Sequence, residues 1–198
     1  MRETSRDERV LHHMTDRQLI RAYAGTQDCR AFGVFVGRHE GALLSFAAAV
    51  LRDDSLAQDV VQETFLRVAR NPQRVLGLNA GATSERNWLL KVVRDLSVDS
   101  LRRRAGERRA VGTLAAGAEK TAPPADAQAE RREDADGVRA AVDRLQPRLR
   151  ELLILKVREQ KSYKEIAQIT GLSVTNVGFL LHQAMQELAR WLQATHGQ

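Results

Sequence analysis

Apolar residues recur with a helical period along most of the chain, at spacings of three and four residues. The clearest stretch runs from Ala31 to Leu51 and predicts one long amphipathic helix. The same period predicts helices from Ser55 to about Arg70 and from Ser84 to about Arg104. Beyond Gly137 the sequence predicts three shorter helices and a final long helix that follows Ser173. All of these predicted elements are helices, so the pattern predicts an all-α protein.

Local signals place the ends of these helices. Ser or Thr followed three residues later by Gln or Glu forms a capping box at Thr15–Gln18, Ser55–Gln58 and Ser162–Glu165. Ser84 and Ser173 are candidate N-caps, and Pro147 suits the first position of a helix. Asn71-Pro72 and Gly171 are predicted to end helices, because neither continues the helical conformation easily.

A change of composition divides the chain into two small helical domains. Residues 111–136 hold eight alanines, Pro123-Pro124 and no apolar period, which predicts a flexible linker, with a transient helix near 125–134 left open. The predicted organisation is an N-terminal arm over 1–14, a helical bundle over 15–110, the linker over 111–136, and a helix-turn-helix domain over 137–195.

Composition narrows the class of protein. The 198 residues carry a formal charge of +6 and are 43% hydrophobic but only 5% aromatic, which argues against a β protein and against a wholly disordered chain. A single cysteine, Cys29, cannot form an internal disulfide. The charged N-terminus and the shortness of the apolar run from Ala42 to Leu51 predict no secretory signal and no membrane insertion, so we expect a cytoplasmic protein.

Enzymatic signals are absent from the sequence. It has no Gly-rich phosphate loop, no HExxH motif and no cysteine cluster, and its five histidines lack ligand-like spacing apart from the doublet His12-His13. We therefore expect no catalytic residue, no metal and no cofactor.

The segment from Ser162 to Gln186 is the strongest functional signal. Two predicted helices separated by Gly171-Leu172-Ser173 are typical of a helix-turn-helix, although a plain helical hairpin with a solvated face has the same pattern. Val174, Val177, Leu181, Ala184 and Leu188 are predicted to face inward. The outward residues can contact base edges, and they are Ser173, Thr175, Asn176, Phe179, His182, Gln183 and Gln186. No Lys or Arg lies between Ser173 and Ala189, so this helix has little charge to offer phosphates.

The helix from Ser84 to Arg104 is basic, and residues 84–110 carry a local charge of +4 from eight basic and four acidic side chains. Lys91, Arg94 and Arg102 lie on one side, with Arg103 and Arg104 at the end, which favours a ridge that follows phosphates. Trp88 is either a core residue or a platform on which an unpaired base stacks. Ordinary i,i+4 ion pairs on a solvated face explain the charges equally well. The charge of +6 points to this first domain as the main phosphate binder.

The helix beginning at Ser55 has an acidic outer face that includes an exposed leucine. Its buried stripe is predicted to be Leu56, Val60, Val61, Thr64, Phe65 and Val68. Asp59, Gln62, Glu63 and Leu66 are predicted on the opposite side. Such a face is either simply solvated or a site where a partner docks.

Taken in order, these segments resemble the extracytoplasmic-function (ECF) sigma factors of bacterial RNA polymerase, over about Thr15 to Leu192. Asp59-Val60-Val61-Gln62-Glu63-Thr64-Phe65-Leu66-Arg67 is similar to the polymerase-binding stretch of region 2. The helix from Trp88-Leu89 to Arg102-Arg103-Arg104 is similar to the promoter-melting helix of that region. Leu145-Gln146-Pro147, Ser162-Tyr163-Lys164-Glu165 and Gly171-Leu172-Ser173-Val174 are similar to region 4.

The resemblance implies functions for particular residues. It implies that Asp59, Gln62, Glu63 and Leu66 dock on the β′ clamp helices of core RNA polymerase, whose β flap is a second contact. It implies that Trp88, Lys91, Arg94, Arg102 and Arg103 lie at the minus-ten element of promoter DNA. The outward face from Ser173 to Gln183 would then lie at the minus-thirty-five element. An anti-sigma protein is an implied partner, and the free protein is expected to be a monomer.

Two alternatives remain open at this level. Glu85 and Asp95 stand where the family usually has an aromatic residue and often an asparagine, and the recognition helix lacks basic residues. These departures suit a sigma-like regulator that binds polymerase or an anti-sigma protein without opening promoters. An ordinary helix-turn-helix repressor would instead be a homodimer on a palindromic operator.

Overall fold

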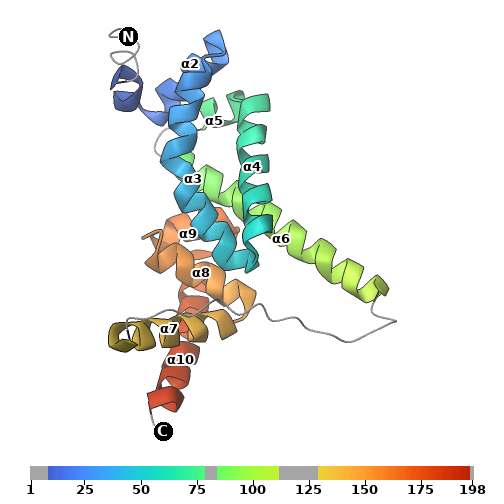
Figure 1. Ribbon diagram of the computed structural model, residues 1–198, viewed down its shortest axis with the longest axis vertical. Coiled ribbons are helices and arrows are strands. Elements are labelled where there is room, and N and C mark those ends of the chain that lie inside the picture. The colour runs from blue at the N-terminus through green and yellow to red at the C-terminus, as the bar shows by residue number, and fades with distance from the viewer. Residues whose placement is uncertain (1–8, 79–83, 112–128, 197–198) are drawn as a thin grey trace.

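The computed structural model describes residues 9–78, 84–111 and 129–196, and every element in these ranges is helical (Figure 1). The helices are α2 (Asp16–Thr26), α3 (Cys29–Leu51), α4 (Asp54–Arg70), α5 (Gln73–Leu76), α6 (Glu85–Val111), α7 (Ala129–Arg144), α8 (Pro147–Val157), α9 (Tyr163–Thr170) and α10 (Val174–His196). The predicted all-α fold class is confirmed.

Helix α3 is the centre of the first domain. It packs against α2, α4 and α6, and Phe35, Leu43 and Phe46 are fully buried among them. From α4 the predicted stripe is buried except for Leu56, which is half-buried. Helix α3 is long and apolar enough to cross a membrane by length and composition, but these buried positions are those of a core helix.

A buried histidine ties α2 to α3. The Nε2 atom of His39 lies 2.7 Å from Asp16 Oδ2, while Arg38 Nη1 donates to Asp16 Oδ1 at 2.9 Å. Partial burial opposes ionisation of Asp16, but the hydrogen bonds from His39 and Arg38 outweigh it, so the pKa of Asp16 is lowered. The carboxylate is therefore held in its charged form between the two helices.

The second domain is formed by α7 to α10. Leu149 and Leu153 of α8 pack with Leu145, and with Ala184 and Leu188 of α10. Arg150 is buried, and its guanidinium donates to the carbonyls of Val142, Asp143 and Leu145 at 3.2, 2.7 and 2.9 Å. This side chain thus satisfies orphan carbonyls at the end of α7.

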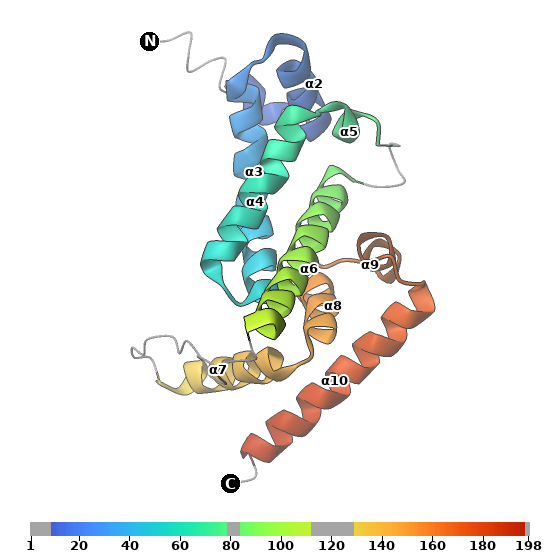
Figure 2. The same cartoon turned by 90° about the vertical axis from the view of Figure 1, so that its right-hand side faces the viewer.

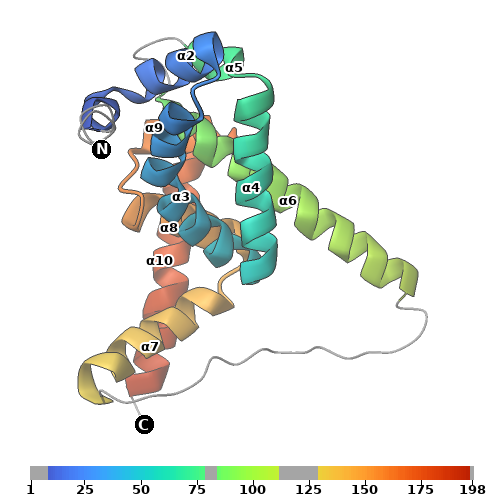
Figure 3. The same ribbon diagram turned by 45° about the horizontal axis from the view of Figure 1, so that its top comes forward.

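The two domains pack directly against each other. Helix α9 lies on α6 and helix α8 lies on α3 (Figures 2 and 3). Leu152, Leu155 and Ile166 of the second domain belong to the same buried cluster as Leu89 and Leu90 of the first. The apolar core therefore continues across the boundary between domains.

Most predicted helix ends agree with the structure. Thr15–Gln18 and Ser162–Glu165 form complete capping boxes, and Pro147 is the first residue of α8. The hydroxyls of Ser84 and Ser173 accept from the amides of Asn87 and Asn176 at 3.1 and 3.2 Å. The capping box predicted at Ser55–Gln58 is wrong, because Asp53 is the N-cap and its carboxylate accepts from the amide of Leu56. An aspartate two residues earlier offers a stronger, charged acceptor.

Three predicted irregular segments contain helical residues. Residues 9–13 of the predicted arm are helical, and Leu11 is buried against the first domain. Helix α5 forms in the segment between the predicted helix end at Asn71-Pro72 and the predicted helix from Ser84, and Arg17 donates to the Leu78 carbonyl at 2.6 Å beside it. Helix α7 begins at Ala129, inside the predicted linker. Residues 1–8, 79–83 and 112–128, which hold the rest of these predictions, lie outside the described residues.

Candidate nucleic-acid and protein interfaces

The outer face of α4 is exposed as predicted. Asp59 and Gln62 are open to solvent, and Leu66 retains 41% of its exposure. Glu63 is partly covered, because its carboxylate bonds Arg67 Nε at 2.9 Å and lies 3.8 Å from Arg70 Nη1. The hydrogen bond from Arg67 lowers the pKa of Glu63. The four residues therefore form one continuous strip with an ionised carboxylate and an apolar side chain.

An apolar groove of about 480 Å³ lies beside this strip, between α3 and α4. Phe32, Val36 and Leu44 come from α3, and Val61, Phe65 and Leu66 come from α4. Leu66 and Gln62 thus belong to both the strip and the groove. The sequence does not predict this groove, because the α3 residues lie far from α4 in the chain and have the spacing of an ordinary buried stripe.

Helix α6 presents its predicted residues in two different environments. Lys91, Arg102 and Arg103 are exposed, and the last two lie on the part of the helix that extends away from the body (Figures 1 and 3). Trp88 is half-buried and packs against the core of the first domain. Arg94 is also half-buried, with Nε donating to Glu151 of α8 at 2.8 Å.

The ion pairs along α6 agree only partly with the expected i,i+4 pattern. Lys91 Nζ lies 3.4 Å from Asp95 Oδ2, as that spacing predicts. Asp99 pairs with Arg102 at 3.7 Å, while Arg103 lies near the Ser100 hydroxyl. Arg104 reaches α4 and pairs with Asp53 at 3.0 Å. The basic ridge is therefore partly neutralised by carboxylates of its own domain.

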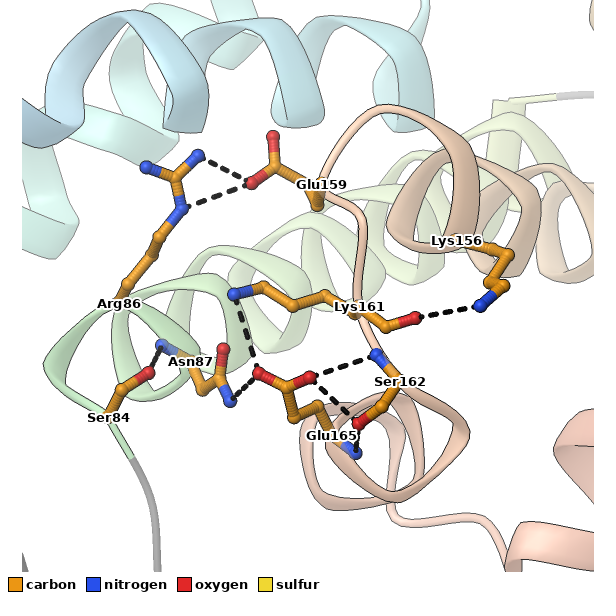
Figure 4. A network of polar contacts seen from close by, with 8 residues as sticks. All are labelled: Ser84, Arg86, Asn87, Lys156, Glu159, Lys161, Ser162 and Glu165. Atoms are coloured by element: carbon orange, nitrogen blue, oxygen red, sulfur yellow. Dashed lines mark hydrogen bonds and ion pairs between the residues drawn. The ribbon is translucent and has the colours of Figure 1, made fainter. Parts of the chain in front are cut away.

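A polar network joins the start of α6 to the second domain (Figure 4). Arg86 Nη2 lies 2.7 Å from Glu159 Oε2, and Asn87 Nδ2 donates to Glu165 Oε1 at 3.0 Å. Glu165 also accepts from the Ser162 amide and lies 3.7 Å from Lys161 Nζ. Hydrogen bonds from Asn87 and Ser162 lower the pKa of Glu165 to about 2. Ser162 and Glu165 are predicted only as a capping box, and nothing in the local sequence marks Arg86 or Glu159, because surface glutamates and arginines are common.

The helix-turn-helix consists of α9, a turn at Gly171, and α10. Gly171 adopts φ +73°, a left-handed conformation that costs glycine little and other residues more. Val177, Leu181, Ala184 and Leu188 are buried, as predicted. The inward placement of Val174 is wrong, because it is 45% exposed. Position 174 is the first residue of α10, where no preceding turn or neighbouring helix covers it.

The predicted reading face of α10 is open to solvent. Ser173, Thr175, Asn176 and His182 are exposed, Phe179 is 66% exposed, and Gln183 is partly covered. The amide of Gln183 donates to Glu187 at 3.2 Å, and His182 lies 3.0 Å from Gln186. An exposed phenylalanine at the centre of such a face is an apolar group that can contact a thymine methyl.

A helical bundle with an exposed strip and a basic helix, joined in one chain to a helix-turn-helix, is the arrangement expected of a two-domain transcription factor. Comparison with known families makes the assignment specific. The model of the family described as "Sigma-70 region 2" matches residues 35–107. The model of the family described as "Sigma-70, region 4" matches residues 136–188.

Relatives give the same result. The RNA polymerase sigma factor CarQ of Myxococcus xanthus is 30% identical over 85% of this chain and 91% of its own length. The ECF RNA polymerase sigma factor SigE of Mycolicibacterium smegmatis is 31% identical over 69% of this chain and 51% of its own length. The chain spans only 39% of the probable RNA polymerase sigma factor RfaY of Xanthomonas campestris, to which it is 30% identical. The chain belongs to the sigma-70 family, in its ECF group.

A solved structure shares the arrangement of both domains. The structure of CnrH in complex with the cytosolic domain of CnrY matches 90% of this chain and 97% of CnrH, with 27% identity and a TM-score of 0.61. The similarity thus extends over both helical domains and not over one alone.

Proposed function

We propose that this chain binds core RNA polymerase in the cytoplasm and directs transcription initiation at specific promoters, as an initiation factor without catalysis of its own. In this proposal the α4 strip docks on the β′ clamp helices and the second domain reaches the β flap. Helix α6 then melts the minus-ten element, and α10 reads the minus-thirty-five element.

The observation that carries the proposal is the coexistence of three separate exposed surfaces in the order that a sigma factor needs. The α4 strip offers an apolar anchor, Leu66, beside a groove and an acidic rim, which is typical of a protein interface. Lys91, Arg102 and Arg103 offer cations to a displaced strand. Phe179, Asn176 and His182 offer groups that distinguish base edges.

The docking step is tested by mixing the purified chain with bacterial core polymerase and measuring the affinity of the complex. Leu66→Ala is expected to weaken binding about tenfold, since central apolar anchors carry most of the energy of an interface. Val10→Ala is the matched control, because Val10 is exposed and lies outside the groove. Failure of the wild-type chain to form a complex at micromolar protein would overturn the proposal.

The promoter step is tested by transcription in vitro from promoters selected out of genomic DNA. Phe179→Ala is expected to lower the yield of promoter-dependent transcript severalfold while leaving the affinity for core polymerase unchanged. A complex that forms with core polymerase but gives no promoter-dependent transcript would favour the second candidate, a sigma-like regulator. The observation that favours this candidate is Asp95, an acidic residue beside Arg94 on the proposed DNA-binding helix.

We also propose that an anti-sigma protein binds this chain. The support is CnrH, which covers both domains of this chain and whose structure was determined with the cytosolic domain of CnrY. The apolar groove between α3 and α4 is a surface that an anti-sigma helix could occupy in competition with polymerase.

A further inference from the structure

The second domain covers the first half of α6 with no partner protein present. Helix α9 packs on α6, while α8 packs on α3 beside it (Figure 2). Leu152, Leu155 and Ile166 belong to the same buried cluster as Leu89 and Leu90 of α6. Apolar contact of this kind is non-directional and does not by itself choose one docked position. The polar contacts at the edge of the interface supply that choice.

Three carboxylates of the second domain meet nitrogen donors of α6. Glu151 accepts from Arg94 Nε at 2.8 Å, and Glu159 accepts from Arg86 Nη2 at 2.7 Å and from Arg86 Nε at 3.2 Å. Oε1 of Glu165 accepts a hydrogen bond from the side-chain Nδ2 of Asn87 at 3.0 Å (Figure 4). All three donors lie within three turns at the start of α6.

The carboxylates of Glu151 and Glu159 are largely removed from water. Each side chain retains 6% of its exposure, against 22% for Arg94 and 39% for Arg86. A buried carboxylate that lost its cation would remain desolvated and unpaired, which is unfavourable. Loss of the contact is therefore more unfavourable for the glutamates than for the arginines of α6. The arginines keep access to solvent, so they are able to exchange one anion for another.

A carboxylate and a phosphate present similar groups to an arginine. Both offer oxygen pairs that accept charge-assisted hydrogen bonds from the guanidinium. We propose that Glu151, Glu159 and Glu165 act as an intramolecular competitor of nucleic acid, so that docking of α8–α9 and DNA binding along the first half of α6 exclude each other. This inference rests on the proposed DNA-binding function of α6.

The competitor does not cover the whole helix. Lys91, Arg102 and Arg103 remain exposed while the domains are docked. Cations on the outer half of α6 can thus attract DNA before the inner half is released. The apparent affinity for DNA is then the intrinsic affinity multiplied by the fraction of molecules in which α8–α9 has left α6.

The test compares the wild-type chain with the double variant Glu151→Gln, Glu159→Gln. X-ray scattering measures the radius of gyration, and fluorescence anisotropy measures binding to a short fluorescein-labelled single-stranded DNA. The variant is expected to have a larger radius of gyration and to bind the DNA at least about tenfold more tightly, because each of the two weakened charge-assisted contacts is large enough to change an equilibrium by about that factor.

Removal of two negative charges raises DNA affinity nonspecifically, so a control with the same net charge is required. Asp28→Asn, Glu40→Gln removes two carboxylates at the start and on the exposed side of α3, of which Asp28 pairs with Arg30, and is expected to change DNA affinity less than twofold, with no expansion. If the interface variant expands but binds DNA no better than this control, the competition is refuted. If no protein in the set binds DNA while the interface variant expands, the DNA-binding function of α6 is itself wrong.

A charge exchange guards against misfolding of the variants. Glu159→Arg places two cations together and is expected to expand the protein, whereas Glu159→Arg combined with Arg86→Glu restores an ion pair of reversed polarity. The combined variant is expected to return to the wild-type radius of gyration with unchanged helical circular dichroism. Equal expansion in both variants would show that the pair does not hold the domains together.

Discussion

At the scale of single residues, Glu165 has two roles in one side chain. One oxygen closes the capping box of α9 with the Ser162 amide and hydroxyl at 2.9 and 2.8 Å. The other accepts from Asn87 across the domain boundary at 3.0 Å. Because both contacts favour the ionised form, the pKa of Glu165 falls from 4.5 to about 2.

This lowered pKa predicts an acid-dependent loss of stability. The stabilisation from ionised Glu165 is fully present above pH 4.5 and is lost as the pH falls toward about 2, because the unfolded chain takes up the proton first. Urea unfolding followed by circular dichroism at pH 6 and at lower pH measures this slope. Glu165→Gln is expected to be less stable at pH 6 and to show a shallower loss in acid; an unchanged slope would contradict the assignment.

Glu151 responds to pH in the opposite sense. Burial raises its pKa above the usual value, although the charge and hydrogen bond of Arg94 oppose the effect. The contribution of Glu151 to folding stability is therefore present below pH 4.5 and declines as the pH rises through its raised pKa. The comparison of the wild-type chain with Glu165→Gln cancels this opposing titration, because Glu151 is present in both proteins.

Arg94 offers a prediction about stability rather than function. Arg94→Ala leaves the carboxylate of Glu151 buried without its cation, so the free energy of unfolding is expected to fall by about 1–3 kcal/mol. Lys91→Ala is the matched control on the same helix, since its pair with Asp95 is exposed and exposed pairs contribute about 0.5 kcal/mol or less. Equal losses in the two variants would show that Glu151 does not depend on Arg94.

At the scale of elements, the turn between α9 and α10 depends on one backbone conformation. Gly171 has φ +73°, and an added Cβ would meet no atom within 4 Å, so steric crowding does not limit substitution there. The left-handed conformation itself costs an L-residue about 1–2 kcal/mol. Gly171→Ala is therefore expected to lower the free energy of unfolding by about this amount, as measured by thermal or urea unfolding.

Gly37 gives the control with the opposite sign. It lies inside α3, is exposed, and has open space where a Cβ would be added. Alanine in a helix interior is more stable than glycine by about 0.5–1 kcal/mol. Gly37→Ala is thus expected to stabilise the protein, and a loss of stability in both variants would mean that the argument from backbone conformation fails.

At the scale of the whole molecule, the two helices proposed to bind DNA differ in charge. The reading face of α10 has no Lys or Arg, whereas Arg102 and Arg103 are exposed. Neutralising both arginines with Gln is expected to reduce the slope of log affinity against log salt by about 1–2 for single-stranded DNA. Phe179→Ala is expected to leave that slope unchanged, because it removes no charge. Binding measured over a range of salt concentrations separates the two.

Two features could not be predicted from the sequence: the packing of the second domain on the first half of α6, and the groove beside Leu66. Arg94 reads as part of a basic ridge along with Lys91, yet only Arg94 meets a carboxylate from α8. Leu66 reads as an isolated exposed leucine, yet it borders a groove lined by α3. Both outcomes depend on contacts between residues far apart in the chain, and helical periodicity carries no information about them.

Local sequence signals predict where most helices begin and end and which of their faces are buried, and the order of the motifs carries the resemblance to ECF sigma factors. Thr15, Ser162 and Gly171 act on backbone groups within a few residues. The helix ends that they form can therefore be predicted from the local sequence. Only the tertiary structure decided that α8–α9 docks on α6, and hence that Arg86, Asn87 and Arg94 already have anionic or polar partners. The physical reason is that docking depends on desolvation and shape over a whole interface, and no single residue encodes it.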